Sequence, residues 1–175
     1  MKKFRNTIII GILCFIGLGQ NTYADISYFI DFSKVLNQSI AGSGAQKVLK
    51  SKLDSTVTKY KQEEDSIRKE EQKIISQRKI ITKEEYKKKV DALRKKVIEL
   101  QKNKEIEFNN LKKLRQTAKT ELLLKLNPII KKYMEDNKIR IVLDKKSILL
   151  ADQKLEITDQ IILILNKEIK KLKLN

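Results

Sequence analysis

Apolar residues recur at seven-residue intervals along two long stretches in the middle of the chain. The first stretch runs from about residue 45 to residue 81, and the second continues to about residue 126. This spacing places the apolar residues along one seam of a helix, and neither stretch contains a Gly or Pro that would interrupt it. The pattern predicts two long helices. Their seam residues are Leu53, Tyr60, Ile67, Ile74 and Ile81 in the first, and Tyr86, Val90, Leu93, Val97, Leu100, Leu111, Leu114 and Ala118 in the second.

The two predicted helices meet at a turn near residues 81–83. Thr82-Lys83-Glu84-Glu85 matches the capping box that starts a helix, in which the Thr hydroxyl and the second Glu carboxylate each satisfy a free backbone amide. A short join folds the two helices into an antiparallel hairpin. At about 1.5 Å per residue, its arms would be roughly 55 and 65 Å long, which is more than a compact domain needs.

Shorter elements are predicted before the hairpin. Apolar residues alternate with polar ones over residues 26–32, as in a strand buried mainly on one face, and residues 33–38 fit a short helical turn. Residues 40–44 contain two glycines and are expected to form a flexible entry to the first arm. Ser43 and Gln46 have the spacing of a capping box for that arm.

The chain after the hairpin is more apolar. Residues 122–134 indicate that the second long helix enters a core, with a bend or a helix restart at Pro128, which has no amide hydrogen to donate. Residues 139–143 and 148–150 are rich in β-branched and aliphatic residues and are expected to pair as a β-hairpin. A last helix is predicted to begin near Thr158.

These elements predict an α+β fold with a small β-rich body, formed by residues 25–44 and 127–175, and a helical-hairpin arm formed by residues 45–126. Three short strands and one short helix cannot bury both of their faces. We therefore expect several chains to share one core; the alternative is a monomer whose arm folds over its own body. The residues expected in the shared core are Ile26, Tyr28, Ile30, Ile141, Leu143, Leu149, Ile161 and Leu165.

The first 24 residues have the pattern of a signal peptide. Lys2, Lys3 and Arg5 precede an apolar run, and Thr22-Tyr23-Ala24 offers small residues at the cleavage positions. The apolar run is shorter than the ~20 residues of a membrane span, which disfavours an anchor. A lipoprotein site at Cys14 is also disfavoured, because the preceding Leu13 is bulky. Cleavage after Ala24 would export a chain that contains no cysteine.

The chain is strongly basic, with a formal charge of +17, and the predicted arms hold 24 basic against 13 acidic residues. Such a surface indicates a polyanionic partner or a solvated helix face. An exported protein does not meet nucleic acid in the cell, so anionic lipid, lipopolysaccharide or an acidic unfolded chain fits better. The arms lack the histidine and cysteine that serve most catalytic and transition-metal sites. We expect no enzyme activity, no cofactor and no metal site.

Segments at both ends of the chain resemble the Skp (OmpH-like) family of periplasmic chaperones. The first segments are Ile26-Ser27-Tyr28-Phe29-Ile30-Asp31-Phe32-Ser33-Lys34-Val35-Leu36-Asn37-Gln38-Ser39 and Gly44-Ala45-Gln46-Lys47. The later ones are Ile141-Val142-Leu143-Asp144-Lys145, Leu149-Leu150-Ala151-Asp152 and Leu155-Glu156-Ile157-Thr158-Asp159. A signal peptide in front and a long basic helical region between them complete the resemblance. The tail Lys167–Asn175 departs from the family pattern, and either extends the last helix or frays.

The resemblance implies a homotrimer with a β-rich trimerisation body and three helical arms around a cavity. It also implies an ATP-independent periplasmic holdase that keeps unfolded outer-membrane proteins soluble for assembly. The alternatives are a structural coiled-coil protein of the envelope and a binder of lipopolysaccharide or an anionic membrane surface. The arm residues expected to contact a client are Lys73, Ile74, Arg78, Lys79, Ile81, Lys87, Lys88, Arg94 and Val97.

Overall fold

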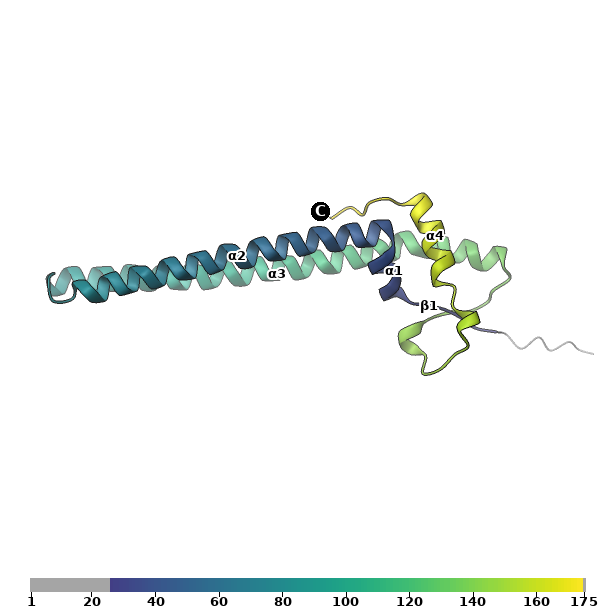
Figure 1. Ribbon diagram of the computed structural model, residues 1–175, viewed down its shortest axis with the longest axis horizontal. Helices are drawn as coiled ribbons and strands as arrows, with labels where there is room; N and C mark the ends of the chain where they lie inside the picture. Colours follow the sequence, from purple (N-terminus) through teal and green to yellow (C-terminus); the bar gives the residue numbers. More distant parts are fainter. Residues whose placement is uncertain (1–25, 175) are drawn as a thin grey trace, which may run out of the picture.

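The computed structural model describes residues 26–174, so the predicted signal peptide and its cleavage site lie outside the described residues. Figure 1 shows a long helical hairpin that projects from a small body. The hairpin consists of α2 (Ile40–Gln77) and α3 (Lys83–Asp136), and the body holds α1 (Phe32–Gln38), α4 (Thr158–Glu168) and two short strands. The predicted α+β class is confirmed, with a much larger helical share than strand share.

Helix α2 begins earlier than the sequence indicated. Ser39 is its N-cap, and the Gly42 amide donates to the Ser39 hydroxyl over 3.0 Å. The first amide of the helix, that of Ile40, donates to the Asn166 side chain of α4 over 2.7 Å. The expected flexible entry at residues 40–44 and the expected cap at Ser43 are therefore wrong, because a buried serine four residues earlier already satisfies the helix terminus.

Helix α3 runs unbroken for 54 residues and includes Pro128. The expected restart at Pro128 is wrong. Proline removes one hydrogen bond, to the carbonyl of Leu124, four residues earlier. Both residues lie on the exposed side of α3, where water can satisfy that carbonyl. The helix then ends at Asp136, and Lys138 follows with a positive φ of 55°.

The two strands pair in parallel rather than as a hairpin. Strand β1 (Tyr28–Ile30) lies beside β2 (Val142–Asp144), with Tyr28 opposite Val142, and an isolated bridge joins Phe29 to Glu156 on the other side of β1. The expected hairpin of residues 139–143 and 148–150 is wrong: the second segment is not a strand. Two 3₁₀ turns, η1 (Lys145–Ser147) and η2 (Gln153–Leu155), occupy the connection instead. β1 gains a partner on both edges, which a hairpin would not supply.

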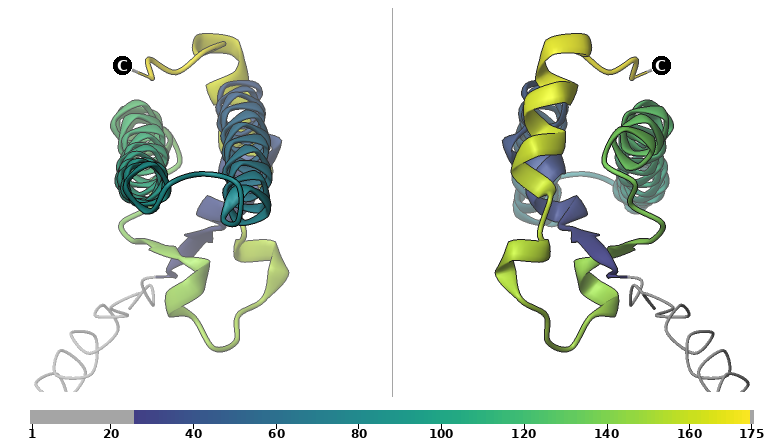
Figure 2. Two further views of the ribbon diagram at one scale, coloured as in Figure 1. Left: turned by 90° about the vertical axis from the view of Figure 1, so that its left-hand side faces the viewer. Right: turned by 90° about the vertical axis from the view of Figure 1, so that its right-hand side faces the viewer.

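The core lies where the body meets the arm. Helix α4 packs against α1 and α3, and the first turns of α2 pack against α1. Figure 2, which looks along the arm, shows α2 and α3 side by side with the strands and the 3₁₀ turns on one side of them. The buried core residues are Ile30, Phe32, Val35, Ala41, Ala45, Ala118, Leu122, Leu126, Ile129, Ile157, Ile161, Ile162, Leu165 and Leu172. The arm helices thus supply much of the core, and they run unbroken through residues 44–45 and 126–127.

Candidate functional site

The arm is a thinly packed pair of antiparallel helices. Tyr60 of α2 is buried, and its ring centroid lies 6.5 Å from that of Phe108 of α3. Further out along α2, Ile74 is also buried, whereas the seam residues of α3 between residues 86 and 114 are half-buried. A seam with so few buried residues gives the outer arm little hydrophobic stabilisation, so we expect it to open locally more readily than the body.

Three polar contacts cross between the helices of the outer arm. The lysine ammonium groups of Lys104, Lys96 and Lys89 lie 2.6, 2.7 and 2.6 Å from side-chain oxygens of Glu64, Glu70 and Gln77, respectively. Each step outward along α2 is matched by a comparable step back along α3, which is the register of an antiparallel hairpin. All three contacts are solvent-exposed, and the two ion pairs among them, Lys104–Glu64 and Lys96–Glu70, contribute only about 0–1 kcal/mol each. They fix the register more than they stabilise the arm.

The arm tip is closed by the capping box that the sequence predicts. The Glu85 amide donates to the Thr82 hydroxyl over 3.2 Å, and the Thr82 amide donates to the Glu85 carboxylate over 3.2 Å. Glu84 and Glu85 also place negative charge in the first turn of α3, where it interacts favourably with the helix dipole. The prediction of a helix start at Thr82 is confirmed.

The structure separates the predicted arm residues into two groups. Ile74 is buried between the helices, and Ile81 and Val97 are half-buried. The six predicted cations are exposed: Lys73, Arg78, Lys79, Lys87, Lys88 and Arg94. Arg78 lies over the Tyr86 ring, 6.0 Å from its centroid, and Arg94 lies 3.6 Å from Asp91.

The outer arm exposes the isoleucines that lie next in sequence to Ile74, Ile81 and Val97. Ile75, Ile80 and Ile98 are exposed, and Ile80 is 81% accessible. Ile75 and Ile98 also line a groove of about 520 Å³ between the helices, together with Val97, Tyr86 and Ile67. The outer arm therefore presents isolated isoleucines among cations.

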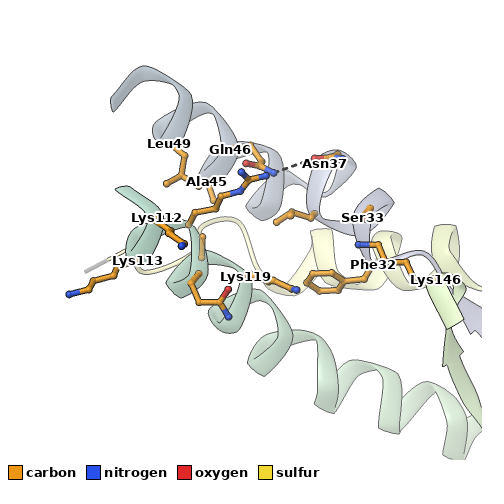
Figure 3. A pocket seen from close by; sticks show the side chains of 14 residues that line it. Phe32, Ser33, Asn37, Ala45, Gln46, Leu49, Lys112, Lys113, Lys119 and Lys146 are labelled. Atoms are coloured by element: carbon orange, nitrogen blue, oxygen red, sulfur yellow. Dashed lines mark hydrogen bonds between the residues drawn. The ribbon is translucent and has the colours of Figure 1, made fainter. Parts of the chain in front are cut away.

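A larger cavity lies where α2 and α3 leave the body, as Figure 3 shows. Its volume is about 700 Å³, and its apolar lining includes Phe32, Leu36 and Leu49. One of its lysines, Lys119, has its ammonium group 6.0 Å from the centroid of the Phe32 ring. The lining holds no carboxylate and five cations: Lys112, Lys113, Arg115, Lys119 and Lys146.

Sequence reasoning missed this cavity because its lining comes from α1, α2, α3 and the η1 turn, which are far apart in the chain. The sequence does contain one signal of a positively charged site. Residues 40–53 and 108–120 contain no acidic residue although the chain as a whole carries 22. Two such runs that meet at the base of a helical hairpin produce a locally positive surface.

The predicted body residues also fall into two groups. Ile30, Ile161 and Leu165 are buried within the single chain, and Tyr28 is half-buried. The exposed ones are Ile26, Ile141, Leu143 and Leu149, and the neighbouring Leu150 is exposed as well. Leu149 and Leu150 lie between the two 3₁₀ turns and have almost no cover from their own chain. Two adjacent leucines in this state are available for contact with another protein.

A polar network joins the start and the end of the body. The Asp31 amide donates to the Thr158 hydroxyl over 2.9 Å, and that hydroxyl donates to Glu156 over 2.8 Å. Lys34 of α1 lies 2.7 Å from Asp159 of α4. The hydrogen bond to Asp159 raises the pKa of Lys34 above its usual 10.5; desolvation opposes this shift, and the negative charges of Asp159, Glu156 and Asp31 add to it. This network has a structural role.

Residues 26–174 contain no group of acidic, histidine or cysteine side chains placed to hold a metal ion. No helix in the same range is both long enough and apolar enough to cross a membrane.

Comparison with known proteins identifies relatives of this chain. Residues 28–165 match the model of a family described as outer membrane protein (OmpH-like). A crystal structure of a "putative outer membrane chaperone (OmpH-like)" from Caulobacter crescentus superimposes with a TM-score of 0.76 at 18% identity, covering 84% of this chain and 87% of that one. At this identity the likeness establishes the fold. No curated protein matches the chain.

Proposed function

Because the chain belongs to the OmpH-like family of outer membrane proteins, we propose that it is an ATP-independent holdase that binds unfolded outer-membrane proteins in the periplasm. On this proposal the chain is exported by a signal peptide cleaved after Ala24, and it keeps its clients soluble until they are assembled. The name of the Caulobacter crescentus relative, which describes a chaperone, supports the same reading.

The observation that carries the proposal is the surface of the arm. Exposed cations surround exposed isoleucines along a hairpin that projects away from the body (Figure 1). An unfolded barrel protein offers acidic stretches to the cations and short apolar stretches to the isoleucines. Each contact is weak, so that clients of many sequences can bind and be released without nucleotide hydrolysis.

We propose that the protein is a homotrimer, as the family resemblance implies. The exposed apolar residues of the body support an interface there, because a lone chain leaves Leu149 and Leu150 in water. Three arms held by one body would enclose a client. Their combined binding would exceed that of one arm by a factor that depends on their spacing, up to about 10²–10⁴.

Two other functions are distinguishable from this one. A structural coiled-coil protein of the envelope would have one stable partner and would not protect unrelated barrel proteins from aggregation. A binder of lipopolysaccharide or anionic membrane surfaces would prefer those ligands to unfolded protein, and its affinity would fall steeply with the logarithm of salt concentration.

The test is light scattering of the mature protein, alone and with an unfolded outer-membrane barrel protein added. We expect a trimer that takes up one client chain and keeps it soluble. A variant with Lys73, Lys87 and Lys88 changed to Glu should remain a trimer and lose client capture at low salt. Unchanged capture would exclude electrostatic binding by the arm, and a trimer that ignores the client would exclude the holdase function.

A further inference from the structure

The tail that follows α4 is packed against the core although it lies beyond the residues that match the family. The match ends at residue 165, and α4 ends at Glu168. Leu172 is nevertheless only 3% accessible and belongs to the same buried cluster as Ala45 of α2 and Ala118 of α3. Ile169 and Leu174 are partly buried against that cluster. The alternative that the tail frays is therefore wrong for Ile169–Leu174.

The tail crosses the arm close to the body. In Figure 1 it turns back from α4 and runs along the arm, and in Figure 2 it passes from α4 across to the side of α3. In Figure 3 it runs behind Lys112 and Lys113, and no tail residue lines the cavity in front. We define the arm base as residues 41–50 of α2 and 112–119 of α3. The tail lies over this arm base.

The tail is an amphipathic segment outside any helix or strand, with a bend at Lys170. Ile169, its first residue, has extended backbone angles of −125° and 113°. Leu172 is buried and Leu174 is partly buried. Lys171, which precedes them, and Lys173, which lies between them, are exposed. In an extended chain, alternate residues point to opposite faces. An unfolded barrel strand, with an apolar residue at every second position, would present the same pattern as residues 172–174.

The charges of the tail are unfavourable for its position. Lys170, Lys171 and Lys173 belong to a segment that lies over an arm base without any acidic residue. The cations of the arm base are Lys47, Lys50, Lys112, Lys113, Arg115 and Lys119. Like charges repel, so burial of the tail's apolar side chains must hold it in place against this repulsion. A segment with the same spacing of apolar residues, but with acidic residues in place of the lysines, would bind the arm base more tightly than the tail does.

We propose that the arm base is a binding site for extended segments that alternate apolar and acidic residues, and that the tail is its weak resident occupant, displaced by such a segment. This inference rests on the proposed holdase function and specifies the client segments that would bind first. The tail keeps the apolar surface covered while no client is present. Its own lysines ensure that it is easily displaced.

Binding of labelled peptides to the full-length mature protein tests this proposal. The first peptide, Leu-Glu-Leu-Glu-Leu-Glu, alternates apolar and acidic residues, the second has lysines in place of these glutamates, and the third contains the glutamates and leucines in two blocks. We expect the alternating acidic peptide to bind at least about tenfold more tightly than the lysine peptide at low salt. This difference should shrink at about 0.5 M salt, where the Debye length is about 4 Å. The block peptide should bind more weakly than the alternating one.

Two variants change the occupancy of the tail in opposite directions. Leu172→Lys should release the tail and tighten binding of the alternating acidic peptide by about tenfold, if the tail covers the site about nine-tenths of the time. Leu163→Lys, at an exposed residue of α4, is its control. Lys171→Glu with Lys173→Glu should hold the tail more firmly and weaken peptide binding. Lys125→Glu with Lys132→Glu, at exposed residues of α3, controls for the same change in net charge.

If each tail variant binds the peptides as its control does, the tail is only a structural strap and the inference is wrong. Leu172→Lys can also lower the stability of the core. The Lys171→Glu/Lys173→Glu variant changes only exposed residues, so it tests the inference without this effect. Peptide binding that responds to the tail without protection of barrel proteins from aggregation would overturn the proposed function alone. Protection that is insensitive to the tail, with peptide affinities unchanged, would overturn this inference alone.

Discussion

Gly42 faces the backbone of Leu36 so closely that a β-carbon on Gly42 would lie 2.3 Å from the Leu36 carbonyl oxygen. Real β-carbons do not approach a backbone oxygen to this distance, so α1 and α2 can cross here only because residue 42 is glycine. Two residues later, a β-carbon on Gly44 would meet no atom within 4 Å. The two glycines look alike in the sequence, and the structure gives them different roles.

Gly42→Ala should therefore destabilise the body, and Gly44→Ala should stabilise it. Separation of α1 from α2 costs about 1–3 kcal/mol, as for other overpacked sites, whereas alanine at an open position inside a helix gains about 1 kcal/mol over glycine. Thermal and urea unfolding of the two variants measures both changes. Equal effects of the two substitutions would show that the contact with Leu36 does not constrain the crossing.

The ion pair between Lys34 and Asp159 should make stability depend on alkaline pH. Because the pKa of Lys34 is raised in the folded protein, its contribution is fully present below the usual 10.5 and is lost as the pH rises through the raised value. The pair is exposed on the Asp159 side, so the effect is small. The urea midpoints of the wild type and Lys34→Met should differ by a constant amount between about pH 7 and 10 and converge above that range. A difference that persists at the alkaline end would mean that packing of the Lys34 stem, and not its charge, stabilises the body.

Replacement of Leu149 and Leu150 by lysine should dissociate the proposed homotrimer without unfolding its subunits. Both side chains are almost fully exposed in the single chain, so the substitutions remove no contact within it. Sedimentation equilibrium should report the monomer mass, and circular dichroism should remain unchanged. Ile80→Lys, at an exposed residue near the arm tip, is the matched control and should leave the mass unaltered. An unchanged mass for the Leu149/Leu150 variant would place the interface elsewhere.

Tyr60→Ala should loosen the arm and leave the body intact. Tyr60 is one of the few fully buried residues of the outer seam and packs against Phe108, so its truncation should cost about 3 kcal/mol, as for other buried aromatics. Hydrogen exchange should accelerate along α2 and α3 outside the arm base and stay slow in α1 and α4. Uniform acceleration would mean that the arm and the body unfold as one unit.

The arm could be predicted from the sequence because its signals are local. A heptad seam and the Thr82 capping box each depend on residues within a few positions of one another. The body could not be predicted in the same way. Residues 139–143 have the composition of a strand, but composition does not identify the strand with which they pair. In the structure this partner is β1, in parallel, and not residues 148–150. Residues 148–150 have strand-like composition as well, and the structure leaves them as an exposed loop.

The packing of the tail and the presence of the cavity could not be predicted from the sequence for a related reason. Ile169 and Leu172 have helical spacing, Leu172 and Leu174 have strand spacing, and neither pattern shows that another helix pair will cover Leu172. The predicted shared-core residues Ile161 and Leu165 are buried within the single chain, because α4 packs against α1 and against α3, which continues from the arm into the body. The residues that remain exposed, Leu149 and Leu150, lie in a segment whose exposure only the structure shows.

The pairing of β1 has a consequence for the order in which this protein folds. Both partners of β1, residue 142 and residue 156, follow it by more than the length of the entire hairpin. Closure of so long a loop is slow, whereas the arm grows from a local turn at Thr82 and needs only its own neighbouring residues. As the chain emerges from N- to C-terminus, the hairpin can form early, while residues 28–30 stay unpaired until residues 142–144 and 156 have been synthesised. We therefore expect the arm to form before the body.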